Sequence, residues 1–272
     1  MDRNSKNKIC AALICGAFLI GALGGLGIGP READRMMEGA EAQAKTTAVS
    51  QPEISPPSVS ASSSVLIDEN GEVLYEKNAD EKSYPASTTK IMTALVTLEK
   101  LDELGLDKKS EIIVPEEAVG IEGSSIYLKK GERLTIEELL YGLMLRSGND
   151  SAAALAACMG GSLGEFVSMM NERAAALGCS GTHFTNPSGL IVRAKDWQSE
   201  DGSRSFHNKN KTVFQYEGAT GIKIGFTKAS GRTLVASAER DGRQMIAVVL
   251  RDGNWFNDAY ALMDYGFEQG GK

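Results

Sequence analysis

Strand-forming segments lie near both ends of this 272-residue chain, and helix-forming segments lie between them. Five short apolar runs carry the strand signal: 65–67, 73–75, 221–226, 233–238 and 244–250. The turn dipeptides Asn70-Gly71 and Asp241-Gly242 each separate two neighbouring runs, as in β-hairpins. Strands contributed by both ends of one chain predict a single antiparallel sheet with a helical region inserted between them, which is an α+β fold.

In the middle of the chain, apolar residues recur every three or four positions, as on one face of a helix. The predicted helices are 87–103, 134–145, 151–158, 163–177 and, near the end, 256–267. Gly105 is expected to end the first of them, and a further short strand is expected at 112–114. Residues 191–216 are polar and lack clear periodicity, so the sequence assigns them no structure.

The first 44 residues have the pattern of an export segment. Arg3, Lys6 and Lys8 precede an uncharged apolar run over 9–29. A cleaved signal peptide and a retained N-terminal membrane anchor both fit, because the run is near the length that spans a bilayer. Ala42-Gln43-Ala44 has the small-x-small form of a cleavage site and slightly favours cleavage. We expect an extracytoplasmic protein that contacts the membrane only through this segment.

Residues 45–63 are rich in Ser, Thr, Ala and Pro and predict a flexible linker. The remaining residues, 64–272, are expected to form the folded domain. The net charge of -7 does not favour a nucleic-acid partner.

Histidine and cysteine are scarce in this chain. With two histidines and no Cys/His cluster, the sequence predicts no metal site and no cofactor. Two of its four cysteines, Cys10 and Cys15, lie in the apolar export segment. The other two, Cys158 and Cys179, fit either a disulfide or two buried thiols.

The most chemically specific feature is the pair Ser87 and Lys90 at the start of the first predicted helix. A spacing of three residues places both side chains on one helical face. A deprotonated lysine can take the proton of a serine hydroxyl and make it a nucleophile, and the helix N-terminus suits a nearby oxyanion. Taken alone, the same pair also fits a helix cap followed by a solvated lysine.

Three motifs that follow one another along the chain favour the catalytic alternative over a helix cap. Residues 85–90 (Pro-Ala-Ser-Thr-Thr-Lys), 147–149 (Ser-Gly-Asn) and 223–225 (Lys-Ile-Gly) resemble the motifs of the serine D-Ala-D-Ala carboxypeptidases. These are low-molecular-weight penicillin-binding proteins, related to the class A β-lactamases. The resemblance covers about 65–190 and 216–267. It implies a β-lactamase/transpeptidase-like fold for 64–272 and an exported enzyme that removes the terminal D-alanine from peptidoglycan stem peptides.

The resemblance also implies roles for individual residues. Ser87 would be the acylated nucleophile, Lys90 its general base, and Ser147 the relay of a proton to the leaving amine. The substrate-binding residues would be Asn149, Lys223, Gly225, Phe226 and Thr227. The backbone N–H groups of Ser87 and Phe226 would form the oxyanion hole. Peptidoglycan stem peptides would be the substrates, β-lactams the inhibitors, and no cofactor is implied.

Two departures from the family pattern keep other functions open. Ile224 stands where the family has threonine, so a hydrogen bond to the substrate carboxylate is lost unless a neighbour such as Thr227, Lys228 or Arg232 replaces it. The 191–216 segment is short for the family, and we expect no C-terminal β-rich domain. These features motivate a second hypothesis, in which the protein is a catalytically weak homologue that binds wall peptides or penicillin. A β-lactamase is less favoured, because no clear deacylating Glu motif follows 147–149.

Overall fold

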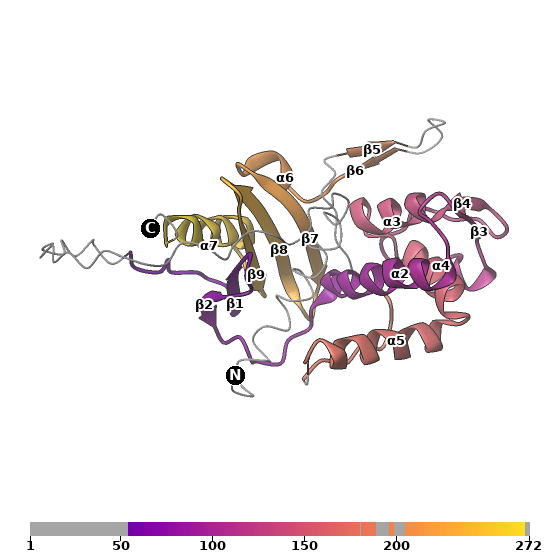
Figure 1. Ribbon diagram of the computed structural model, residues 1–272, viewed down its shortest axis with the longest axis horizontal. Helices are drawn as coiled ribbons and strands as arrows, with labels where there is room; N and C mark the ends of the chain where they lie inside the picture. Colours follow the sequence, from indigo (N-terminus) through magenta and orange to yellow (C-terminus); the bar gives the residue numbers. More distant parts are fainter. Residues whose placement is uncertain (1–53, 180, 189–195, 199–204, 270–272) are drawn as a thin grey trace, which may run out of the picture.

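The computed structural model describes residues 54–179, 181–188, 196–198 and 205–269. Its main sheet has five antiparallel strands in the order β2-β1-β9-β8-β7 (Figure 1). The strands are β1 (Ser63–Asp68), β2 (Val73–Lys77), β7 (Ala219–Thr227), β8 (Gly231–Arg240) and β9 (Arg243–Leu250). The prediction of one sheet built from both chain ends is therefore confirmed.

The register of β1 against β9 joins the two ends of the domain. Ser63 pairs with Leu250, and Asp68 pairs with Met245, so the whole of β1 lies along β9. Gly71 in the first hairpin and Gly242 in the last both have positive φ, which the tight turns require. This pairing leaves β7, which carries Lys223, at one edge of the sheet.

The helical region lies on one side of the sheet and α7 (Trp255–Gln269) on the other (Figure 1). The helices of that region are α2 (Lys90–Leu104), α3 (Ile136–Leu145), α4 (Asn149–Gly160) and α5 (Leu163–Ala176). Smaller elements there are the 3-10 turns η1 (Ala86–Thr89) and η2 (Glu116–Ala118) and the strand pair β3 (Glu111–Ile113) and β4 (Arg133–Thr135). All five predicted helices are present, each within a few residues of its expected bounds.

Local sequence signals explain where these helices begin and end. Thr135 and Glu138 form a capping box that starts α3, because each side chain accepts from the backbone N–H of the other residue. Ser162 caps α5 by accepting from the Glu165 N–H. Gly105 adopts a left-handed conformation and ends α2, as predicted.

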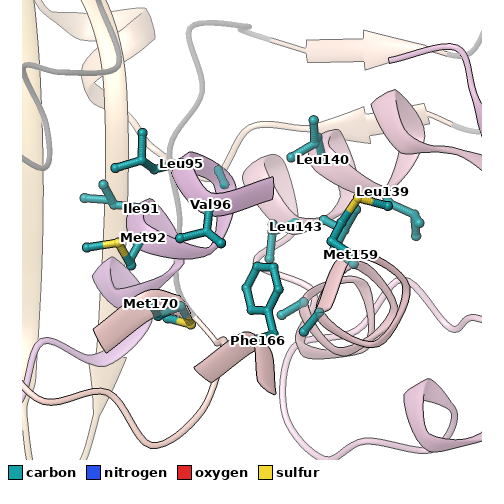
Figure 2. Packing of buried hydrophobic residues seen from close by; sticks show 14 of the residues in the cluster. Ile91, Met92, Leu95, Val96, Leu139, Leu140, Leu143, Met159, Phe166 and Met170 are labelled. Carbon is teal, nitrogen blue, oxygen red and sulfur yellow. The ribbon is translucent and has the colours of Figure 1, made fainter. Parts of the chain in front are cut away.

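Two hydrophobic cores lie on the two faces of the sheet. Alternation along β9 sends Ile246 and Val248 to the helical region, and Met245, Ala247 and Val249 to α7. Figure 2 shows how the helical side is filled by side chains from α2, α3, α4 and α5 that point toward one another. Those labelled are Ile91, Met92, Leu95, Val96, Leu139, Leu140, Leu143, Met159, Phe166 and Met170. This packing fixes the position of α2, whose first residue is Lys90.

The structure adds elements that the sequence did not predict. In the 191–216 segment, β5 (Asp196–Gln198) pairs with β6 (Ser205–His207), and α6 (Thr212–Gln215) leads into β7. These elements are too short to give a periodic apolar pattern. At the other end, Val59 and Ala61 are buried, so ordered packing begins before residue 63, where the linker was expected to end.

Some expectations fall partly or wholly outside the described residues. The predicted export segment, 1–44, lies outside them, as does the linker up to residue 53. Across the described ranges, no single helix has the length and apolarity to cross a bilayer, and α4 and α5 reach that length only when joined across an 86° bend. Cys158 has a free thiol, so it does not pair with Cys179.

Candidate active site

Ser87 lies in the η1 turn, just ahead of α2. The predicted helix began at Ser87, but the α-helix begins at Lys90, and a 3-10 turn precedes it. Ala86 has a φ of 50°, an uncommon conformation for a residue with a Cβ. The 3-10 turn keeps the two functional side chains together, since Lys90 Nζ lies 3.4 Å from Ser87 Oγ.

Lys90 is fully buried, and its amine lies among oxygen atoms. Lys90 Nζ is 3.0 Å from Ser147 Oγ, 2.8 Å from the Ser147 carbonyl oxygen and 3.0 Å from Asn149 Oδ1. Burial lowers the pKa of Lys90 to about 7; the positive charge of Lys209 acts in the same direction, and the negative charge of Asp150 opposes both. Near neutral pH a large share of Lys90 is therefore unprotonated and able to accept a proton.

Ser147 occupies the bend between α3 and α4. It has a φ of 61°, in the left-handed region that few non-glycine residues adopt. This bend turns its side chain toward the amines, so Ser147 Oγ lies 3.1 Å from Ser87 Oγ and 3.0 Å from Lys223 Nζ. Ser147 Oγ is thus within hydrogen-bond distance of the hydroxyl of Ser87 and of both buried lysines.

Asp150, in the first turn of α4, holds the loop beside the site. Its buried carboxylate accepts hydrogen bonds from the Ser125 hydroxyl and from the backbone N–H groups of Ile126 and Leu128. The same loop binds Asn149, whose Nδ2 donates to the Glu122 carbonyl at 2.8 Å. Two neighbouring side chains of α4 therefore position this loop on the site.

The edge strand β7 forms the side of the site opposite this loop. Lys223 is 3% exposed, and burial together with the charge of Lys90 holds its pKa well below the ordinary value. Gly225 lets the strand approach the nucleophile, because a Cβ at this position would lie 2.9 Å from the Ser87 backbone nitrogen. The third motif therefore needs glycine for steric reasons.

A cavity of about 220 Å³ opens beside Ser87. Its lining residues are Ser87, Ser124, Met144, Leu145, Ser147, Asn208, Lys209, Asn210, Ile222, Lys223, Ile224, Gly225, Phe226 and Trp255. Among these described residues there are two lysines and no Asp or Glu. Phe226 is 64% exposed at this site. A partly apolar cavity lined by lysines and without an acid suits a small anionic ligand.

Most residues predicted for the site are brought together by the structure. Ser87, Lys90, Ser147, Asn149 and Lys223 form one connected set of contacts, and Gly225 and Phe226 line the cavity. Thr227 is placed differently. Its hydroxyl lies 2.8 Å from Ser230 Oγ in the β7–β8 turn, and it is not among the lining residues.

Asn208, Lys209 and Asn210 line the cavity but were not singled out from the sequence. They lie in the segment that lacked periodicity. Two Asn residues flanking a lysine were the available signal, because asparagine side chains commonly form local turns. No group of three or more potential metal ligands occurs within the described residues.

Comparison with known proteins identifies the family. Residues 46–201 and 191–254 match the family model described as D-alanyl-D-alanine carboxypeptidase, which covers more than half of the chain. The chain belongs to the D-alanyl-D-alanine carboxypeptidase family.

Curated family members are similar over much of the domain. D-alanyl-D-alanine carboxypeptidase DacF of Bacillus subtilis is 36% identical over 220 residues, which are 70% of this chain and 57% of DacF. D-alanyl-D-alanine carboxypeptidase DacB2 of Mycobacterium tuberculosis is 31% identical over 236 residues, 73% of this chain and 79% of DacB2. The match thus spans less than two thirds of the length of DacF.

Solved structures of penicillin-binding proteins share the fold. Penicillin-binding protein 6B from Escherichia coli has a TM-score of 0.71 and 27% identity, covering 79% of this chain and 80% of that one. Penicillin-Binding Protein D2 from Listeria monocytogenes, in a cefotaxime-bound form, has a TM-score of 0.69 and 27% identity. The match covers 80% of this chain and 100% of that one. These similarities confirm the predicted transpeptidase-like α+β fold.

Proposed function

We propose that this protein is an exported serine carboxypeptidase that removes the terminal D-alanine from peptidoglycan stem peptides. The observation that carries the proposal is the buried amine of Lys90, with a pKa of about 7, beside the hydroxyls of Ser87 and Ser147. Family membership supports the substrate class, and the charged and apolar pattern of residues 1–44 supports export.

In the first step, Ser87 Oγ attacks the carbonyl carbon of the penultimate D-alanine. Neutral Lys90 accepts the hydroxyl proton as the new C–O bond forms. The negative charge on the former carbonyl oxygen is held by backbone N–H groups of Ser87 and Phe226, where β7 passes close to η1.

The tetrahedral intermediate then loses the terminal D-alanine. Its C–N bond breaks, and the amine leaves with a proton delivered through Ser147 Oγ, which lies 3.0 Å from Lys90 Nζ. Ser87 is left as an ester of the shortened peptide. A water molecule attacks this ester and gives a proton to Lys90, which is neutral again after the amine has left. Lys90 returns this proton to the departing Ser87 oxygen, and the shortened peptide is released as a carboxylic acid that ionises in water.

Burial of the site favours the neutral base that the first step needs. Lys223 Nζ donates to Ser147 Oγ, and burial together with the charge of Lys90 holds the pKa of Lys223 well below its ordinary value. Burial, with a contribution from the charge of Lys209, lowers the pKa of Lys90 to about 7 against the opposing charge of Asp150. A β-lactam places its carbonyl carbon at the same nucleophile, so we expect it to acylate Ser87.

Labelling with a fluorescent penicillin tests the nucleophile. The protein of residues 45–272 should be labelled, Ser87→Ala should not, and peptides ending in D-Ala-D-Ala should release free D-alanine. Absence of labelling in the parent protein would contradict the proposal.

One observation favours a second candidate, a homologue that is acylated but turns over slowly. Ile224 lines the cavity and packs on the α7 side of the sheet, and its side chain offers no hydrogen-bond donor. Acylation without release of D-alanine, together with a gain of turnover in Ile224→Thr, would support this candidate. A β-lactamase is not favoured, since none of the described lining residues is an acid that could activate the deacylating water; rapid β-lactam hydrolysis would reverse that view.

A further inference from the structure

Two buried carboxyl groups lie where β9 turns into α7, on the far side of the sheet from the helical region. Asp252, in the turn, is 2% exposed, and Asp258, in the first turn of α7, is 5% exposed. The Ser60 hydroxyl lies 2.6 Å from Asp252 Oδ1 and 2.9 Å from Asp258 Oδ2. Two buried negative charges around one hydroxyl are costly, because a serine has a single proton to donate and like charges repel. The pair is stabilised when one of its carboxyl groups keeps a proton.

The hydrogen bonds of the two carboxyl groups differ. Asp258 accepts at both oxygens: Oδ2 accepts from the backbone N–H groups of Ser60 and Ala61, and Oδ1 accepts from the Asn254 side chain at 2.8 Å. Asp252 Oδ1 accepts from the Asn254 backbone N–H at 2.9 Å, but its Oδ2 is buried and no described group donates to it. Several donors stabilise an ionised carboxylate, and a buried oxygen without a donor favours the neutral acid. Asp258 therefore has the surroundings of an ionised carboxylate, and Asp252 those of a protonated one.

The pKa values of the two groups move apart in the same sense. Burial raises the pKa of Asp252 against the hydrogen bonds from Ser60 and Asn254, and the charge and side chain of Asp258 add to the rise. Burial also acts to raise the pKa of Asp258, but the hydrogen bonds from Ser60, Asn254 and Ala61 outweigh it and lower that pKa.

The cations on the surrounding elements do not bond to either carboxyl group. Lys77 on β2 donates to a backbone carbonyl ahead of β1, and Arg251 at the end of β9 donates to a carbonyl of the β7–β8 turn. The side chain of Arg232 on β8 is exposed. Along its described length α7 has no lysine or arginine, and its other acids, Asp264 and Glu268, are exposed. The charge balance of the pair therefore depends on its own proton.

The pair holds the segment that precedes β1, residues 59–62, which we call the N-terminal strap. The backbone of the strap is bonded to Asp258 through two N–H groups, and Ser60 bridges both carboxyl groups. On either side of Ser60, Val59 and Ala61 are buried in the core beside α7. Repulsion between the two carboxyl groups would therefore act directly on the contacts that hold the strap.

The same turn places Trp255 at the active-site cavity. Asn254 bonds to both carboxyl groups, and the next residue, Trp255, lines the cavity that contains Ser87. Arg251, at the start of the turn, has a φ of 50°, which is uncommon for a residue with a Cβ. Such a backbone conformation persists only where the surrounding contacts hold it, so the position of Trp255 depends on them.

We propose that Asp252 and Asp258 hold one proton between them, and that this proton fastens the N-terminal strap and positions Trp255 in the wall of the active-site cavity. The two acids are positioning residues for Trp255. Because the pKa of Asp252 is raised in the folded protein, its contribution is lost as the pH rises through that pKa. The contribution of Asp258, whose pKa is lowered, is lost only as the pH falls through its own pKa. The strap is held best between these two values and loosens as the pH rises.

The emission of Trp255 tests its positioning. The chain has two tryptophans, so Trp197→Phe leaves Trp255 as the only one, and its emission is titrated from about pH 4 to about pH 9. We expect a shift with a midpoint above the ordinary pKa of aspartate. Asp252→Asn, whose amide donates as the protonated acid does, should keep the acid-side spectrum throughout. The exposed Asp241→Asn in the β8–β9 turn is the matched control and should leave the midpoint in place. A shift that persists in full in Asp252→Asn would overturn the proposal.

Hydrogen exchange measures the strap directly, through the N–H groups of Ser60 and Ala61 that donate to Asp258. At about pH 8 this peptide should exchange about tenfold faster in the parent protein than in Asp252→Asn, and at about pH 5 the two rates should agree. Comparison at one pH removes the intrinsic pH dependence of exchange. Asp258→Asn should exchange faster than the parent at both pH values, because it loses the ionised acceptor. Equal rates in the parent and Asp252→Asn at both pH values would overturn the proposal.

Neither measurement uses turnover or acylation. A failure of the proposed function would appear as a parent protein that neither reacts with penicillin nor releases D-alanine. The shared proton is decided separately, by the emission of Trp255 and the exchange of the strap.

Discussion

Lys90 Nζ lies 3.0 Å from Ser147 Oγ, although 57 residues separate the two in the chain. The amine also contacts the Ser147 carbonyl and the Asn149 side chain, so its position is fixed by three acceptors on the α3–α4 bend and the start of α4. Burial at this position lowers the pKa of Lys90 to about 7, and its protonation state therefore changes within the range where enzymes usually work.

The rate of acylation should rise with pH and then level off. The base must be neutral, so below pH 7 the fraction of active enzyme increases about tenfold per pH unit, and above the pKa it stays constant. The second-order rate constant for reaction with a fluorescent penicillin, measured from pH 5.5 to 9, should show a midpoint near 7. In Lys209→Met the midpoint should move upward, because the charge of Lys209 lowers the pKa of Lys90. A profile that falls with rising pH would argue against Lys90 as the base.

Replacing Ser147 should separate its chemical role from its backbone conformation. Ser147→Ala and Ser147→Gly both remove the hydroxyl that contacts Ser87 and the two lysines, so acylation should fall by about a hundredfold or more in each. The φ of 61° suits glycine, so Ser147→Gly should be more stable than Ser147→Ala by about 1 kcal/mol. Urea unfolding measures that difference. Equal stability of the two variants would mean that the backbone at residue 147 leaves the left-handed conformation in Ser147→Ala.

Gly225→Ala should damage the site more than the fold. The new Cβ would lie 2.5 Å from Thr233 Oγ1 and 2.9 Å from the Ser87 nitrogen, so β7 and η1 must move apart. We expect acylation to fall at least tenfold, with about 1 to 3 kcal/mol of lost stability. Gly164→Ala on α5 is the control, since nothing lies within 4 Å of its added Cβ. Unchanged acylation in Gly225→Ala would show that the close approach is not needed.

Asp150→Asn should lower both the stability of the protein, through the loop that Asp150 holds, and the pKa of Lys90. The amide cannot accept all the hydrogen bonds from Ser125, Ile126 and Leu128, so stability should fall by about 2 kcal/mol or more. The negative charge that raises the pKa of Lys90 is also lost, so the midpoint of the acylation profile should shift toward acid. The exposed Asp102→Asn on α2 should change neither property. A midpoint that stays in place would show that Asp150 is only structural.

Much of the fold could be predicted because its signals are local. Apolar periodicity gave α3 and α5, and the turn glycines Gly71 and Gly242 marked two hairpins of the sheet. The convergence of Ser87, Ser147 and Lys223 could be predicted only from the resemblance to a family, because nothing in their spacing requires residues 136 positions apart to meet. Their assigned roles in catalysis remain predictions.

What the sequence did not predict depends on tertiary contacts. The 3-10 turn at Ser87 follows a residue with positive φ, Ala86, a conformation that propensity does not predict for alanine. The turn around Lys209 is built from Asn208 and Asn210 side-chain bonds to the backbone. Such bonds leave no periodic pattern, and only the packed structure shows that they border the cavity.

The pairing of β1 with β9 has a consequence for how the protein matures. Ser87 is made early during synthesis, yet the sheet cannot close until residue 250 has left the ribosome. Lys223 belongs to β7 of that sheet, so a chain still emerging lacks the contact between Lys223 and Ser147. The set of contacts around Ser87 is therefore complete only when the domain has been made as far as residue 250.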